Sequence, residues 1–199
     1  MIKKGFTLVE ILVVIAILSV LGVLILTIFT RTLRGSNKSQ IIGKIKQNGQ
    51  SVLEQMDKTV RNSDKVVCVI SSNLVVVKNG IYTRYRFIPP TSSANGLIQQ
   101  DNPAKQNVQD SNPPSEETDS EFKNRVCTID DSMSEALIIT DTNLQTGVSV
   151  ENGLFTRDRS AGFLDQVTIS FVLKPAVDVS QAVAGQIDPV SFQTTIQLR

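Results

Sequence analysis

Residues 6–29 read FTLVEILVVIAILSVLGVLILTIF, a run of 24 residues in which Glu10 carries the only formal charge. A helix of this length spans about 36 Å, which is enough to cross roughly 30 Å of membrane hydrocarbon. The run is longer than the apolar core of a secretory signal peptide, and no small-residue cleavage site follows it. We therefore expect residues 6–29 to form a single membrane-spanning helix.

Basic residues flank this helix on both sides. Lys3 and Lys4 precede it and favour a cytoplasmic N-terminus, because cytoplasmic flanks carry an excess of Lys and Arg. Arg31, Arg34 and Lys38 follow it and weaken that argument. Charge alone therefore favours the cytoplasmic orientation without deciding it.

Glu10 needs its own explanation. A carboxylate at the centre of a membrane helix costs roughly 2.5–3.5 kcal/mol, and less near the interface. Glu10 lies about one turn into the run, so it could extend toward the lipid headgroups. It could also pair with a positive charge, but apart from Lys3 and Lys4 the chain offers none nearby. The residues leave both explanations open.

The stretch KKGFTLVEILVVIAIL (residues 3–18) resembles the leader and N-terminus of type IV pilins and type II secretion pseudopilins. The resemblance implies that a prepilin peptidase cuts after Gly5, leaving residues 1–5 as a leader, and that Phe6 is then N-methylated. It also implies that Glu10 pairs with the α-ammonium of a neighbouring subunit. The implied partners are other pilin or pseudopilin subunits, contacted through the N-terminal helix, an inner-membrane assembly platform and membrane lipid.

Elementary electrostatics agrees with that implication. Cleavage would remove Lys3 and Lys4 and create a free amine on Phe6, at a helix N-terminus where an anion is favoured. A carboxylate–ammonium pair is stronger in a low dielectric than in water, although desolvation offsets much of the gain. Glu10 is therefore expected to need a partner inside a bundle of packed helices.

Helical periodicity continues over residues 30–62. Apolar residues recur on one face if Gly49 fills the gap in the stripe, and polar residues lie elsewhere. The stripe is Ile41, Ile45, Val52, Met56 and Val60. This half reads as an amphipathic helix that docks one face on a globular domain.

Residues 63–199 are predicted to form a β-rich domain. Three β-branched runs, at 66–70, 74–78 and 81–87, are separated by SSN and by Asn79-Gly80, a type I′ hairpin signal. Further strands are expected at 125–129, 136–140, 148–155, 166–173 and 191–198. The predicted fold class is α+β: a long N-terminal helix packed on an antiparallel sheet.

Residues 89–121 hold five of the seven prolines and many polar residues, so we expect an exposed, mobile loop. Cys68 and Cys127 lie on expected strands on either side of it. Outside the cytoplasm they could form a disulfide, or they could remain buried thiols, because pairing needs Cα atoms within about 7 Å.

Several classes of function are disfavoured. The chain has no histidine and no P-loop, GxSxG or metal-ligand cluster, so we expect no enzyme, no metal and no cofactor. Asp141–Gly147 fails the EF-hand pattern at Thr146 and Asn152. The acidic run at 115–121 reads as a solvated loop. Lys and Arg total 20 against 19 Asp and Glu, which gives no reason to expect nucleic acid.

Two weaker resemblances concern the subtype. QNGQSVLEQMDKTVRNSDKV (residues 47–66) and SFQTTIQLR (191–199) resemble W-type minor pilins and J-type minor pseudopilins. They imply a minor pilin of a type IV pilus or related competence filament, held in the inner membrane before assembly, with its domain outside. The alternatives are a J-like pseudopilin of type II secretion and, from another class, a single-pass adhesin that never polymerises.

Overall fold

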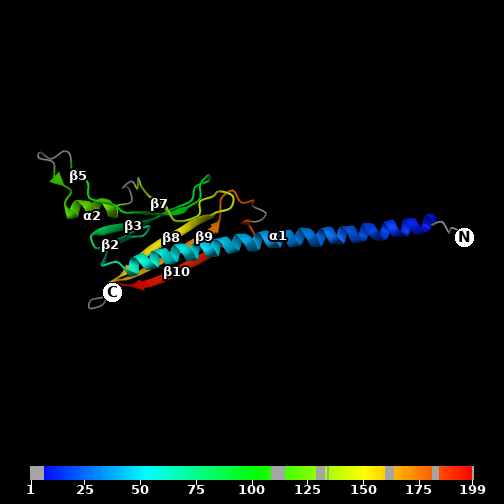
Figure 1. Cartoon of the computed structure of the whole chain (residues 1–199), viewed down its shortest axis with the longest axis horizontal. Coiled ribbons are helices and arrows are strands. Elements are labelled where there is room, and N and C mark those ends of the chain that lie inside the picture. The colour runs from blue at the N-terminus through cyan, green and yellow to red at the C-terminus, as the bar shows by residue number, and fades with distance from the viewer. Residues whose placement is uncertain are drawn as a thin grey trace. The chain divides into compact units, whose positions relative to one another are not determined.

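The computed structural model describes residues 7–108, 115–128, 133, 135–159, 164–180 and 184–198. The chain divides into two compact units, residues 1–40 and residues 41–199. Helix α1 (Leu8–Arg61) contributes to both units (Figure 1). No proline interrupts it.

Residues 41–61 of α1 belong to the second unit and bury one face. The buried positions are Ile45, Gly49, Val52, Met56 and Val60, so the amphipathic stripe expected from the sequence is confirmed. Lys44, Lys46 and Lys58 lie on the exposed side. The stripe packs on the antiparallel strands of the domain, which confirms the α+β fold.

Gly49 is needed where α1 meets the sheet. A Cβ atom added at Gly49 would lie 2.2 Å from Cζ of Phe192, whereas one added at Gly43 meets nothing within 4 Å. The absent side chain therefore makes room for the Phe192 ring, which stacks on Phe171 with the ring centroids 5.3 Å apart. Gly49 fills the gap in the apolar stripe because of this close approach.

Gly49→Ala is expected to lower the free energy of unfolding by about 1–3 kcal/mol, because the ring has to move. Gly43→Ala is the matched control and should raise it by up to about 1 kcal/mol, since alanine is the better helix former. Urea unfolding of the full chain in mild detergent, followed by the fluorescence of Tyr82 and Tyr85, measures both. Equal effects of the two substitutions would contradict the close approach.

One sheet has five antiparallel strands in the order β1-β2-β3-β4-β7. Their bounds are β1 Lys65–Ile70, β2 Asn73–Lys78, β3 Ile81–Ile88, β4 Leu97–Asp101 and β7 Leu137–Ile138. Asn79 and Gly80 have φ angles of 50° and 79°, as the type I′ turn between β2 and β3 requires. The predicted meander is therefore confirmed, with boundaries shifted by a residue or so.

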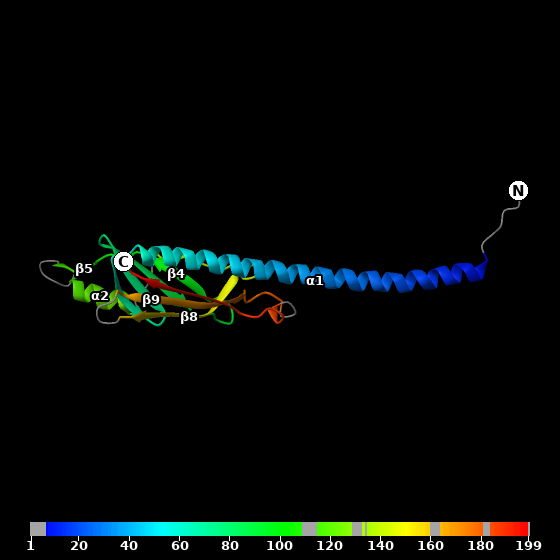
Figure 2. The ribbon, with the colours of Figure 1, turned by 90° about the horizontal axis from the view of Figure 1, so that it is seen from below.

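A second sheet has the order β10-β9-β8, with β8 at Val148–Asp158, β9 at Gln166–Pro175 and β10 at Val190–Gln197. The last three strands predicted from the sequence are thus present. Val167, Ile169 and Phe171 alternate inward along β9, as expected of a sheet with one buried face. Figure 2 shows the strands beside the C-terminal part of α1.

A single core joins the two sheets to residues 41–61 of α1. Phe87 of β3 stacks on Phe155 of β8, with the ring centroids 4.4 Å apart. The backbone N–H of Phe155 donates to the carbonyl oxygen of Ser71 at 2.7 Å, which ties β8 to the β1–β2 turn. Rings and backbone bonds therefore hold the two sheets together as one domain.

The segment between β4 and β7 differs from the sequence expectation. We expected residues 89–121 to be a mobile loop, but Leu97–Asp101 forms β4 and Ile98 is fully buried. Short strands β5 (Asn107–Val108) and β6 (Ser115–Glu116) also pair. The segment is polar in composition apart from one short apolar run, Leu97-Ile98. This run is enough to add a strand beside β3.

The strand expected at 125–129 is also wrong, because helix α2 spans Asp119–Cys127. Thr118 caps it, and the Glu121 side chain bonds back to the Thr118 backbone, forming a capping box. Phe122 and Val126, four residues apart, are its buried residues together with Cys127. The acidic run 115–121, expected to be a solvated loop, therefore forms β6 and starts α2. The strand expected at 136–140 shrinks to β7.

Helix α2 covers the face of the five-stranded sheet opposite to α1. Phe122 and Val126 pack with Val75 of β2, whereas the neighbouring residues Leu74 and Val76 belong to the core around α1. Both faces of β2 are therefore buried, which explains why five consecutive residues of β2 are buried.

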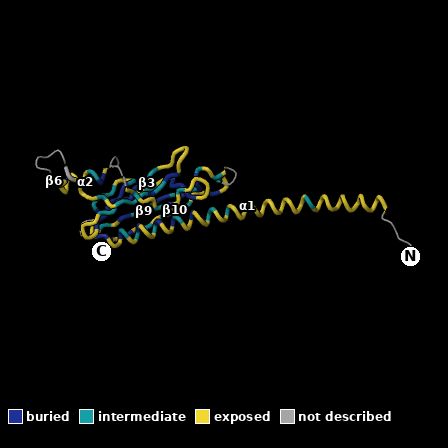
Figure 3. Tube along the Cα trace, turned by 45° about the horizontal axis from the view of Figure 1, so that its top comes forward, coloured by how far each residue is buried: buried dark blue, intermediate teal, exposed yellow. Residues whose placement is uncertain are grey.

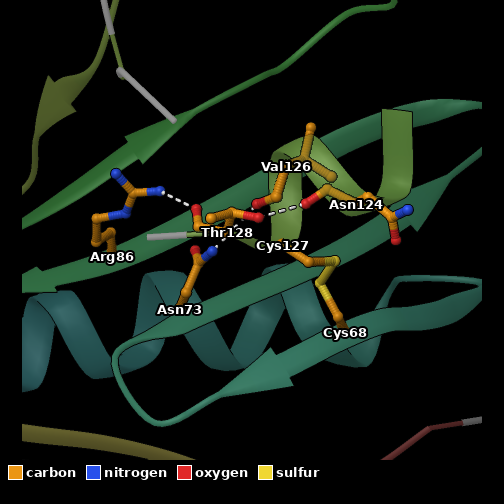
Figure 4. The surroundings of a disulfide bond; sticks show 7 residues. All are labelled: Cys68, Asn73, Arg86, Asn124, Val126, Cys127 and Thr128. Atoms are coloured by element: carbon orange, nitrogen blue, oxygen red, sulfur yellow. Dashed lines mark hydrogen bonds between the residues drawn. A yellow bond between two sulfur atoms is a disulfide. The ribbon is translucent and has the colours of Figure 1, made fainter. Parts of the chain in front are cut away.

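A disulfide joins Cys68 of β1 to Cys127 at the end of α2 (Figure 4), with the two Cα atoms 6.2 Å apart. The Asn73 side chain donates to the carbonyl oxygen of Val126 at 3.1 Å, and Arg86 donates to that of Thr128 at 3.0 Å. These contacts hold the end of α2 against the sheet. Cys127 ends a helix, not the strand on which the sequence placed it.

Glu117, just before α2, forms an ion pair with Arg125 in the last turn of that helix. Its two carboxylate oxygens accept from Nε and from a terminal nitrogen of Arg125, each at 2.9 Å. Hydrogen bonding to Arg125 lowers the pKa of Glu117 below its ordinary value of 4.5. The pair therefore stabilises the fold fully above pH 4.5, and this stability is lost as the pH falls through the lowered pKa.

Glu117→Gln is expected to lower the free energy of unfolding by roughly 1–3 kcal/mol at neutral pH. The difference from the unsubstituted chain should shrink as the pH falls from 4.5 through the lowered pKa, because the glutamate is neutral in both states only below that pKa. Urea unfolding across this pH range measures it. A difference that does not change with pH would contradict the charged hydrogen bond.

Candidate functional site

The first unit presents an apolar surface with no cover from the described part of the chain. Seventeen large apolar residues lie between Leu8 and Phe29, each at least 48% exposed (Figure 3). By length and composition α1 is able to cross a membrane, with a mean hydropathy of 3.2 in its most apolar window. Leaving such a surface in water costs roughly 1.5–3 kcal/mol for each large residue. This segment is therefore built for lipid or for other helices.

Hydroxyl groups within the apolar segment are engaged by the helix itself. Ser19 Oγ donates to the carbonyl oxygen of Ile15 at 2.8 Å, and Thr27 Oγ1 to that of Val23 at 2.8 Å. Thr30 bonds in the same way to the carbonyl oxygen of Leu26 at 3.0 Å. These bonds allow the polar residues to lie in an apolar environment.

Glu10 lies in the first turn of α1 and forms a reciprocal cap with Thr7. The backbone N–H and the hydroxyl of Thr7 both donate to Oε2 of Glu10 at 3.0 Å, and the N–H of Glu10 donates to Oγ1 of Thr7 at 3.3 Å. This is a capping box, which satisfies donors that the start of a helix leaves without partners.

This cap was not predicted, although its pattern is present in the sequence. Thr7-Leu8-Val9-Glu10 is the T-x-x-E signature of a capping box. A carboxylate has two oxygens with about four acceptor positions, so the bonds to Thr7 leave room for a second partner. The cap therefore gives Glu10 a local role without excluding an intermolecular one.

The predicted processing residues lie outside the described residues. They are the leader residues Lys3 and Lys4, the cleavage residue Gly5 and the methylation residue Phe6. Glu10 is the one member of the predicted N-terminal set that the structure places.

The described residues of the domain contain no group of three or more His, Cys, Asp or Glu placed to hold a metal ion. In the Asp141–Gly147 segment, side-chain oxygens of Asp141 and Asn143 accept from backbone N–H groups. A cavity of about 470 Å³ beside β4 is lined by Arg84 and Arg125 among others, and both arginines are held by carboxylates.

Comparison with known families matches the N-terminal stretch. A family model described as the prokaryotic N-terminal methylation motif matches residues 1–26. The matched residues include Gly5, Phe6 and Glu10, and they support the resemblance to type IV pilins and pseudopilins. Comparisons with curated proteins and with solved structures gave no match.

Proposed function

Because the chain carries the N-terminal methylation motif of type IV pilins and pseudopilins, we propose that it is a minor subunit of a type IV pilus or related competence filament. A prepilin peptidase removes residues 1–5, and the new N-terminus at Phe6 is methylated. The subunit waits in the cytoplasmic membrane and joins the filament through its N-terminal helix, with the help of an assembly platform in the inner membrane.

One observation supports this proposal above the others. Residues 8–29 of α1 expose a largely apolar surface, interrupted by Ser19 and Thr27, and a carboxylate lies in its first turn. Lipid covers such a surface before assembly, and neighbouring helices cover it afterwards. Lipid tails and the apolar surface of a helix are similar in polarity. Moving α1 from lipid into a bundle of helices therefore changes its hydrophobic free energy little. A subunit can therefore leave the membrane for the filament.

Glu10 favours one alignment of the helices in the assembled filament. Cleavage after Gly5 creates an amine at Phe6, four residues before Glu10. In the assembled bundle the amine of one subunit pairs with Glu10 of its neighbour. Leaving the carboxylate unpaired inside a packed bundle would cost several kcal/mol, so assembly favours the register in which it is paired.

Two alternative functions are tested alongside this one. A J-like minor pseudopilin of type II secretion shares the N-terminal chemistry, and the genes adjacent to this one would distinguish the two systems. A non-polymerising membrane adhesin would need no peptidase. N-terminal sequencing of the protein from its host should therefore begin at Phe6, and a chain that still begins at Met1 would exclude both filament readings.

Glu10→Gln is expected to reduce incorporation into sheared filaments by at least about tenfold, which corresponds to about 1.4 kcal/mol, and to leave membrane insertion intact. Glutamine can still accept the capping bonds of Thr7, but it has no charge for an ammonium. Immunoblots of filament and membrane fractions measure the effect.

Thr7→Ala is the matched control, because it removes the hydroxyl of the cap and leaves the carboxylate. It should destabilise the helix start by about 0.5–2 kcal/mol and reduce incorporation far less than Glu10→Gln. If Thr7→Ala is the more damaging substitution, Glu10 acts mainly as a cap and the pairing role is lost. The abundance of the chain in filaments distinguishes a minor from a major subunit.

A further inference from the structure

Three basic residues follow the apolar segment of α1 on one face of the helix. Arg31, Arg34 and Lys38 are spaced by three and four residues, which places them one above another along a helix. Arg31 and Arg34 are exposed, and Lys38 is half-buried. All three belong to the first unit, residues 1–40. We refer to these three residues as the basic cluster.

The basic cluster has no negative charge near it along the helix. No Asp or Glu occurs between Glu10 and Glu54, so none lies within a helical turn of the cluster. None of its three residues forms an ion pair with a described residue. The hydroxyls of Thr30 and Thr32 donate to carbonyl oxygens of their own helix, at 3.0 and 2.9 Å. Within the part of the chain that the structure describes, the cluster therefore lacks a counter-charge.

The cluster lies at the depth of lipid headgroups when the apolar segment spans a membrane. Residues 8–29 cover about 33 Å, close to the roughly 30 Å of the hydrocarbon layer. Arg31 follows Phe29 by about 3 Å and Arg34 by about 8 Å, in or beside a headgroup layer of roughly 5–7 Å. Lys38 follows by about 14 Å. Side chains of a helix lean toward its N-terminus, so all three extend back toward the headgroups.

Gly35 lies on the same face, four residues after Arg31 and three before Lys38. A Cβ atom added at Gly35 would meet nothing within 4 Å in the described chain. The surface of the helix is therefore open at Gly35, with basic side chains on both sides along the axis. A phosphate group has room to approach the backbone there and to contact the cluster.

We propose that the basic cluster and Gly35 bind the phosphate of an anionic phospholipid in the outer leaflet of the cytoplasmic membrane. The inference rests on the proposed function for the orientation of α1 and for its place in the membrane before assembly. A guanidinium group matches two phosphate oxygens with parallel hydrogen bonds, and a lysine adds a mobile point charge. Each basic side chain near an anionic membrane surface strengthens binding about fivefold.

Lipid fits the basic cluster better than acidic side chains of a neighbouring protein. The cluster begins two residues after the apolar segment, so headgroups lie beside it before any neighbouring subunit is present. Its charge also runs against the usual bias, because the exported flank of a membrane helix carries fewer Lys and Arg than the cytoplasmic flank. A ligand on the exported side accounts for this exception.

The test titrates dioleoylphosphatidylglycerol into the full chain in mild detergent and counts the bound lipid by native mass spectrometry. Dioleoylphosphatidylcholine is the control lipid, because its phosphate is already balanced by its own choline cation. We expect phosphatidylglycerol to bind at least about tenfold more tightly. Equal affinity for the two lipids would overturn the proposal. Displacement of phosphatidylglycerol by equimolar inorganic phosphate would reveal a site for free anions and would overturn it as well.

Two charge-matched variants locate the binding site. Arg31→Gln with Arg34→Gln removes two charges from the cluster. Lys44→Gln with Lys46→Gln removes two exposed charges from the same helix, more than about 20 Å beyond Phe29. The first pair should weaken phosphatidylglycerol binding at least about tenfold, and the second less than about twofold. Equal losses would indicate a general attraction to positive charge, and no loss from the first pair would place the lipid elsewhere. Either result contradicts the proposed site.

Gly35→Ala fills the open space on the cluster and leaves every charge in place. It should weaken phosphatidylglycerol binding about threefold without lowering the Tm, because alanine is the better helix former. Gly43→Ala, also in open space, is the matched control and should leave the affinity unchanged. Unchanged affinity in Gly35→Ala would refute the close approach of the phosphate to the backbone.

The results separate this inference from the proposed function. A chain that still begins at Met1 and is absent from filaments overturns the proposed function, whereas the lipid titration reports on the cluster directly. The Arg31 and Arg34 variant could instead bind phosphatidylglycerol like the unsubstituted chain and enter sheared filaments less. That result would assign the cluster to a neighbouring subunit and overturn the lipid proposal alone.

Discussion

Asp101→Asn is expected to lower the free energy of unfolding by about 3–5 kcal/mol, because it removes a carboxylate that pairs with a buried guanidinium. Arg84 is 1% exposed, and its Nε donates to Oδ1 of Asp101 at 2.9 Å. A terminal nitrogen of Arg84 also bonds the second carboxylate oxygen. The pair joins β3 to β4 on the face that α2 covers. Urea unfolding followed by tyrosine fluorescence measures the loss.

The double substitution Arg84→Met with Asp101→Leu is the control. Replacing a buried ion pair by apolar residues of similar size is often neutral or stabilising, because neither charge has to be desolvated. The double variant should therefore be more stable than Asp101→Asn alone. If both variants lose the same stability, packing at these positions matters and the charge does not.

Replacing Cys68 and Cys127 together by serine is expected to lower the free energy of unfolding by about 4 kcal/mol. The two residues are 59 positions apart, so the bond closes a long loop in the unfolded chain, and closing that loop in advance reduces its entropy. The loss should be concentrated in α2, which the bond holds against β1. Hydrogen exchange at Phe122 and Val126 measures it, together with the unfolding curve.

Reduction of the unsubstituted chain provides the control for the serine hydroxyls. Reduced protein and the double variant should unfold at the same urea concentration, and reduction should leave the variant unchanged. A reduced chain as stable as the oxidised one would show that the apolar contacts and hydrogen bonds of α2 hold it in place without the disulfide.

Patterns that repeat along the chain were read correctly from the sequence. The apolar stripe of α1 and the Asn79-Gly80 turn are local signals, because helix periodicity and a positive φ are set by neighbouring residues. The role of Gly49 could be predicted only as a gap in the stripe. That Phe192 fills this gap depends on residues far apart in the sequence.

The predictions from the sequence were wrong where local signals compete. The β-branched content around residues 125–129 favoured a strand, but the capping box at Thr118 and Glu121 and the spacing of Phe122 and Val126 favour a helix, and these prevailed. The Thr7–Glu10 cap was not predicted either, although Thr7-Leu8-Val9-Glu10 has the same spacing as the cap of α2. Both caps could have been found from T-x-x-E alone.

The hydroxyl groups that bond to the backbone of α1 itself have a mechanical consequence. Ser19, Thr27 and Thr30 bond their own backbone, so between Ile11 and Thr30 the helix offers its neighbours aliphatic contact without direction. Two such rods lose little when one slides along the other by a turn, about 5.4 Å. In the filament proposed above, their alignment would depend on the proposed pairing of Glu10 at one end. Such a filament would lengthen under load as its helices slide along the axis, and it would regain its length when the Glu10 pair forms again.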